Sequence, residues 1–105
     1  DVSMPDDTRV TLTNTDAEEG YPIAGFTWLL LYKDQAYSNR KQDRVKAMLN
    51  LMWWMIHKGQ QYTKPLNYAP LPENAVNKAE AVLKSVTFDG EPVLKDPDQA
   101  TANAE

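Results

Sequence analysis

The chain has 105 residues and a net charge of −4, with 11 lysines and arginines against 15 aspartates and glutamates. This length allows one small domain, or part of a larger one, and excludes two independent cores. Without cysteine there is no disulfide, thiolate metal site or cysteine nucleophile. The longest apolar runs are far shorter than the roughly 20 residues that span a bilayer. The acidic balance argues against a nucleic-acid partner.

Two β-strands are predicted in the first third of the chain. Residues 8–15 alternate Val10 and Leu12 with polar, β-branched neighbours, a pattern typical of a half-buried strand. Between the two strands, Pro22 and Gly25 disfavour a regular ladder. Residues 26–34, FTWLLLYKD, form a nearly continuous apolar run. Such a run predicts a strand buried on both faces of a parallel or mixed sheet.

A long amphipathic helix is predicted next. Apolar residues recur at helical spacing at Val45, Met48, Leu49, Met52, Trp53 and Ile56. Leu51, Trp54 and Met55 widen this apolar stripe, so we expect a helix that is covered on more than one side. Two continuations are open. Gly59 can end the helix with a left-handed cap, or the chain can continue through a bend until Pro65, and we favour the bend.

A second helix and a short hairpin follow. Pro72 suits the first turn of a helix, Glu73 complements its positive end, and Lys84 complements its negative end. Helical spacing continues through Ala75, Val76, Ala79, Val82, Leu83 and Val86. Asp89 and Gly90 then predict a tight turn between two short apolar pieces. The predicted fold class is therefore α/β, with two or three strands and two main helices.

The sequence contains no recognisable catalytic constellation. His57 is the only imidazole and lies near the end of the first helix, where a histidine ordinarily interacts with the helix dipole. The three serines are not in a G-x-S-x-G elbow, and no glycine-rich phosphate loop is present. Residues 14–25 resemble a calcium loop only superficially, because the twelfth position is Gly25 and not glutamate. We expect no enzyme activity, cofactor or metal.

Several motifs resemble one transport family. Residues 20–35, GYPIAGFTWLLLYKDQ, look like the C-terminal third of the phosphate-binding protein of bacterial phosphate ABC transporters. The likeness continues through His-Lys-Gly-Gln at residues 57–60 and through residues 66–72, where Tyr-Ala-Pro-Leu-Pro is the most specific piece. It covers about residues 9–94. The resemblance implies a periplasmic or extracytoplasmic solute receptor with two α/β lobes that delivers inorganic phosphate to the permease.

The resemblance also implies a division of this chain. Residues 1–28 would belong to the second lobe and the hinge crossing, with Thr27, Trp28 and Leu29 as the hinge. Residues 29–94 would form the C-terminal part of the first lobe, and the polar residues 95–105 a disordered tail. The family holds phosphate with hydroxyls, amides, an aspartate and an arginine from earlier segments. No phosphate ligand, catalytic residue or metal ligand is therefore carried over to this chain.

Two functions remain open at this stage. The chain is either the scaffold and hinge segment of such a receptor, or a standalone or self-associating interaction module that lacks anion binding. Uncovered strand edges and apolar faces would favour a homo-oligomer or strand exchange in the isolated chain. The first ten residues contain neither a basic nor an apolar signal region. We therefore expect that any export signal has been removed.

Overall fold

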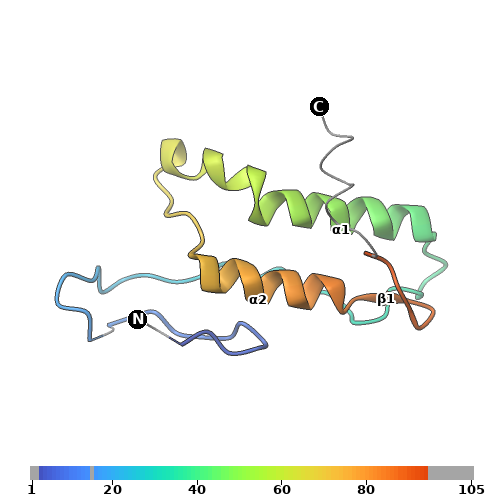
Figure 1. The fold of residues 1–105 in the computed structure, drawn as a ribbon, viewed down its shortest axis with the longest axis horizontal. Coiled ribbons are helices and arrows are strands. Elements are labelled where there is room, and N and C mark those ends of the chain that lie inside the picture. The colour runs from blue at the N-terminus through green and yellow to red at the C-terminus, as the bar shows by residue number, and fades with distance from the viewer. Residues whose placement is uncertain (1–2, 15, 95–105) are drawn as a thin grey trace.

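The computed structural model describes residues 3–14 and 16–94, which contain two main helices and one small sheet. Helix α1 spans Gln42–Ile56 and helix α2 spans Glu73–Lys84, with the 3-10 turns η1 (Lys58–Tyr62) and η2 (Lys64–Leu66) between them. Strands β1 (Thr87–Phe88) and β2 (Glu91–Pro92) form the sheet. The two α-helices lie side by side and antiparallel, and the N-terminal third of the chain runs past α2 (Figure 1). The predicted α/β class and both predicted helices are confirmed.

The core lies where one face of α1 meets the end of α2 and the sheet. Val45, Leu49 and Trp53 of α1 are at most 5% exposed, and Met48, Met52 and Ile56 pack around them half-buried. Leu83 of α2 and the following Val86, Val93 and Leu94 complete the buried cluster. The apolar stripe predicted from helical spacing is thus the buried face of α1.

The second apolar face of α1 is not covered. Leu51, Trp54 and Met55 are 56%, 36% and 39% exposed, so the prediction of a helix packed on several sides is wrong for this chain. The apolar partners in the buried cluster, from α2, the sheet and Leu31, lie on the Leu49 face, and on the second face the Tyr62 ring lies 6.1 Å from the Trp54 ring. The apolar residues of the second face therefore remain in contact with solvent.

The chain turns after α1 without a left-handed glycine. His57 leaves the helix with φ −117° and ψ −97°, and the backbone continues as η1 and η2 until Asn67, whose φ of 63° ends the run. The predicted bend is confirmed, although its turns are 3-10 and not α. Gly59 is needed for space: a Cβ there would lie 3.1 Å from the Trp54 ring.

Neither predicted N-terminal strand forms. Within residues 8–14, Thr8 and Asn14 have φ values of 61° and 52°, which break an extended strand at both ends. Residues 26–33 have no regular structure, and Leu30 is 93% exposed. A strand requires a neighbour for its backbone groups, and the described residues offer one only at Asp34, which forms a parallel bridge with Thr87.

The hairpin is confirmed as predicted. Strands β1 and β2 pair antiparallel with Phe88 opposite Glu91, and the turn between them has φ 52° at Asp89 and φ 80° at Gly90. Positive φ at both central residues defines the turn that suits the twist of a two-residue hairpin. Together with the bridge at Asp34, this sheet is mixed in direction.

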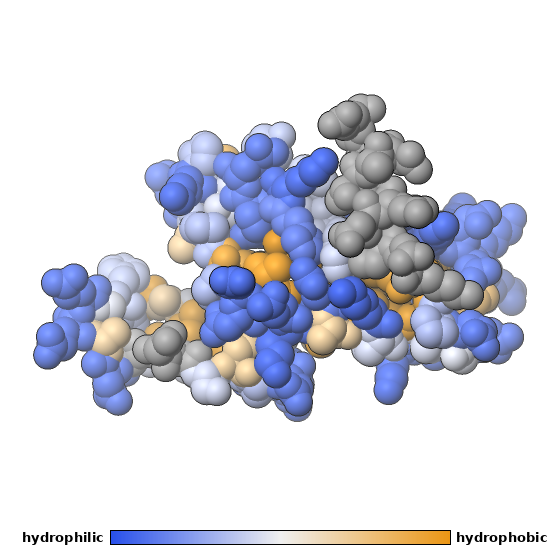
Figure 2. Space-filling model, viewed as in Figure 1, coloured by the Kyte–Doolittle hydropathy of each residue, from blue (hydrophilic) through white to orange (hydrophobic). Residues whose placement is uncertain are grey.

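The molecule is open for its size. Its radius of gyration is 15.6 Å, whereas a compact chain of this length has about 13 Å. It exposes 8344 Å² of surface, compared with about 5,900 Å² for a compact protein of this mass. Apolar side chains reach the surface between and below the helices (Figure 2). The predicted polar tail, residues 95–105, lies outside the described residues.

Candidate functional site

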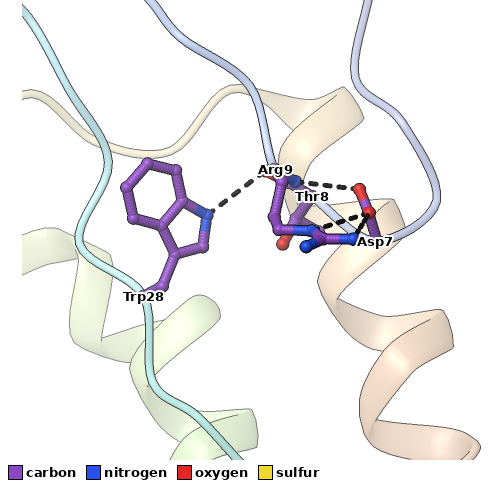
Figure 3. Close-up of polar contacts among 4 residues, drawn as sticks. All are labelled: Asp7, Thr8, Arg9 and Trp28. Atoms are coloured by element: carbon purple, nitrogen blue, oxygen red, sulfur yellow. Dashed lines mark hydrogen bonds and ion pairs between the residues drawn. The ribbon is translucent and has the colours of Figure 1, made fainter.

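The predicted hinge residues Thr27, Trp28 and Leu29 lie in the segment without regular structure. The indole Nε1 of Trp28 donates a hydrogen bond to the carbonyl oxygen of Thr8 at 3.2 Å (Figure 3). The Phe26 ring meets the indole edge-on at 6.3 Å. Trp28 is nevertheless 46% exposed. It joins two stretches of chain that are 20 residues apart, with little packing around the junction.

An ion pair flanks this junction. The Arg9 guanidinium donates to the Asp7 carboxylate, with Nε 2.8 Å from Oδ2, and the Arg9 backbone nitrogen donates to Oδ1 at 3.1 Å (Figure 3). The side-chain hydrogen bond from Arg9, followed by the backbone one, lowers the pKa of Asp7. Both side chains are well exposed. Because its charge already has a carboxylate partner, Arg9 is poorly suited to hold an anion.

Asp34 fixes the end of the apolar segment to the hairpin. Its Oδ2 accepts hydrogen bonds from the Gly90 amide and the Thr87 hydroxyl, each at 2.8 Å, and its Oδ1 accepts from the Ala36 amide at 2.9 Å. The Gly90 hydrogen bond, then those from Ala36 and Thr87, lower the pKa of Asp34 to about 2. An ionised carboxylate can only accept hydrogen bonds, so these three donors stabilise the charged form of Asp34. Asp34 is therefore a structural anchor.

Gln35 is a buried polar residue whose amide nitrogen and oxygen each have a hydrogen-bond partner. It is 1% exposed; its Nε2 donates to the Tyr32 carbonyl, and its Oε1 accepts from Arg40, both at 2.7 Å. The Arg40 guanidinium also lies over the Tyr37 ring at 4.7 Å, and the Tyr37 ring meets the Tyr32 ring edge-on at 4.9 Å. These residues form a corner that turns the chain toward α1. Sequence reasoning missed it, although an amide directly after an apolar run was a usable signal.

His57 connects the two helices. Its Nδ1 lies 2.8 Å from the Trp53 carbonyl oxygen, which can only accept, so Nδ1 carries the hydrogen. Its Nε2 lies 2.7 Å from Oε1 of Glu80 on α2, and Lys84 Nζ lies 3.6 Å from the other Glu80 oxygen. The predicted role at the end of α1 is confirmed by the contact with Trp53. The structure adds Glu80 as its partner, and the hydrogen bonds of the His57 ring within residues 3–14 and 16–94 go to Trp53 and Glu80.

The described residues offer little to an anion or a metal. The first turn of α1 contains Asp43 and that of α2 contains Glu73, so each positive helix end already has a carboxylate near it. Across residues 3–14 and 16–94, no three His, Asp or Glu side chains converge as metal ligands would. In the same part of the chain, no helix is long and apolar enough to cross a membrane.

Comparison with known proteins relates the chain to phosphate receptors. It is similar to the phosphate-binding protein PstS of Pasteurella multocida (strain Pm70), with 29% identity over 76 residues, which are 72% of this chain and 21% of that protein. It is 30% identical over 76 residues to the phosphate-binding protein PstS of Haemophilus influenzae (strain ATCC 51907), again 72% of this chain and 22% of the relative.

These similarities cover only a part of each relative. The chain spans about a fifth of the length of the curated relatives it matches. No family model matches the chain. No solved structure matches it. The similarity therefore links an α/β segment of this size to phosphate-binding proteins, both of which are named for binding and not for catalysis.

Proposed function

We propose that this chain acts as a scaffold and hinge segment of a phosphate receptor that delivers phosphate to an ABC transporter outside the cytoplasm. The observation that carries the proposal is the similarity of 72% of the chain to two phosphate-binding proteins. The segment contributes architecture and no phosphate ligand. Three charged residues support this, because Arg9 and Arg40 have partners within the chain and Asp34 accepts three hydrogen bonds.

The open surface also supports a segment of a larger fold. Residues 26–33 follow the pattern of a buried strand, yet Trp28, Leu29, Leu30 and Tyr32 are exposed here. In a complete receptor, neighbouring strands would pair with this segment and remove it from water. The second face of α1, with Leu51 and Trp54, would be covered in the same way. Residues 1–28 would then belong to one lobe and residues 29–94 to the other.

Phosphate titration by calorimetry tests this function. The 105-residue chain alone is expected to show no binding, and the longer protein that contains it is expected to bind phosphate. Sulfate serves as the matched anion control. Binding by the short chain would contradict the absence of ligands from this segment. If the longer protein failed to bind phosphate, the interaction-module function would replace the receptor function.

The hinge assignment has its own measurement. If the chain crosses between lobes at Thr27, Trp28 and Leu29, the surroundings of the Trp28 indole change when phosphate closes the longer protein. Its tryptophan fluorescence should then respond to phosphate, and Trp28→Phe should remove most of the response. Trp54→Phe is the matched control, because Trp54 is on the uncovered face of α1, away from the hinge. A response that survives Trp28→Phe and is lost in Trp54→Phe would overturn the assignment.

A further inference from the structure

Most backbone groups of residues 25–32 have no hydrogen-bond partner, the Tyr32 carbonyl that accepts from Gln35 being the exception, and the segment also has exposed apolar side chains. Among the described residues, no backbone–backbone hydrogen bond involves this segment, although Lys33 and Gln35 just beyond it both bond to Thr87. Such a row of free donors and acceptors is a template for pairing with another strand. The segment contains no proline and no charged residue to prevent that pairing.

Three large apolar side chains of the segment would share one face of a strand. Trp28, Leu30 and Tyr32 are 46%, 93% and 69% exposed, and residues two apart lie on the same face. On the other face Leu31 packs against the core, whereas Leu29 is 57% exposed. Pairing would therefore place an apolar stripe of two large rings and a leucine on one face.

We propose that residues 26–34 of two copies of this chain pair antiparallel about a two-fold axis at Leu30. In that register Leu30 faces Leu30 of the second copy, and Trp28 faces Tyr32 of the second copy. Aromatic pairs across strands are favourable, and no like charges meet, because Lys33 and Asp34 would face the uncharged Thr27 and Phe26 of the second copy. The stripe is thus complementary to itself, which a two-fold contact between identical chains requires.

The exposed area is sufficient for this partner. The chain exposes about 2,400 Å² more than a compact protein of its mass, and a standard interface covers about 800 Å² of each partner. The contact also ends at two copies. Thr87 already bonds one edge of the chain at Lys33 and Gln35, so at that end only the opposite edge is free to pair. A dimer with one shared edge follows, and not an open fibre.

Light scattering coupled to size exclusion tests the dimer directly. The 105-residue chain should elute at twice its mass of 11.9 kDa. Leu30→Lys places two lysines opposite each other and should raise the dissociation constant about tenfold or more. Leu66→Lys is the control, since Leu66 is 66% exposed in η2, outside the stripe. Circular dichroism should show unchanged helix content in both variants. A monomeric wild-type chain, or open-ended oligomers, would overturn the proposal.

The absence of cysteine provides a test of register. Leu30→Cys should form a disulfide between copies on mild oxidation, because facing residues in an antiparallel pair lie about 5 Å apart at Cα. Leu66→Cys should crosslink only at the rate of random collision. Equal rates for the two variants would contradict pairing at Leu30. The pairing applies to the 105-residue chain alone, because neighbouring strands would cover the same segment in the longer receptor proposed above. These results do not depend on phosphate binding by that longer protein, so the two proposals can fail separately.

Discussion

The backbone nitrogen of Gly90 donates a hydrogen bond to Oδ2 of Asp34 at 2.8 Å, although the two residues are 56 positions apart. The same oxygen accepts from Thr87, so one carboxylate holds both β1 and the turn that follows it. The neighbouring backbone pairs with Thr87 through Lys33 and Gln35. The position of the hairpin relative to the N-terminal third of the chain therefore depends on Asp34.

This anchor should be sensitive to acid. The pKa of Asp34 is lowered from 3.8 to about 2 by its hydrogen bonds with Gly90, Ala36 and Thr87. The stabilisation is therefore complete above the unfolded value and is lost as the pH falls through about 2. We expect faster exchange and a chemical-shift change of the Gly90 amide over that window, measured by NMR. In Asp34→Asn the acid-dependent step should disappear. A Gly90 amide that does not respond would contradict the anchor.

The turn should require glycine at position 90. Gly90 has a φ of 80°, and a residue with a Cβ pays about 1–2 kcal/mol in the left-handed region. Gly90→Ala should lower the free energy of unfolding by about that amount, measured by urea denaturation. Gly25→Ala is the matched control: its φ lies outside that region and a Cβ there meets nothing within 4 Å. Equal effects of the two substitutions would argue against the observed turn.

The two faces of α1 should differ sharply in their contribution to stability. Leu49 is fully buried, so Leu49→Ala should cost about 2–5 kcal/mol through lost burial and the cavity it leaves. Leu51 is on the same helix but is 56% exposed, and Leu51→Ala should change stability by no more than about 0.5 kcal/mol. Urea denaturation of both variants provides the measurement. A large cost at Leu51 would contradict the exposed second face of α1.

The pair between His57 and Glu80 should stabilise the contact between α1 and α2. Their side chains are 29% and 25% exposed and the Nε2 to Oε1 distance is 2.7 Å. A double-mutant cycle with His57→Gln and Glu80→Gln should give a coupling of about 0.5–1 kcal/mol. A parallel cycle between His57 and Lys78 is the control, because Lys78 of α2 pairs with Asp6 instead. A coupling of zero between His57 and Glu80 would contradict a direct interaction.

The elements that could be predicted from the sequence are those with local signals. Helical spacing from Val45 to Ile56 identified α1 and its buried face, and the pair Asp89 and Gly90 identified the hairpin. Both depend on residues within a few positions of one another. The strands predicted at residues 8–15 and 26–34 did not form, because a strand depends on residues that are distant in sequence. Their apolar patterns describe what a strand would bury, but a strand also needs a neighbour that the described chain supplies only at Asp34.

The polar contacts of the candidate site also could not be predicted from local sequence patterns. Asp34 meets Gly90, and His57 meets Glu80 from 23 positions away, so no spacing rule connects them. Gln35 is the exception, because Arg40 is five residues away and an amide after a buried run needs a partner. The hinge at Thr27, Trp28 and Leu29 came from family resemblance and stays a prediction.

The parallel bridge between Asp34 and Thr87 also bears on the order in which the molecule folds. It closes a loop that contains both helices, and the entropy lost in closing so long a loop is recovered only after the helices have packed. The helices and the hairpin, by contrast, close through contacts that are near in sequence. Assembly of the bridge therefore belongs to the last stage of folding. The same contact is the first to be lost in a local opening, which would separate Lys33, Asp34 and Gln35 from Thr87 without unfolding α1.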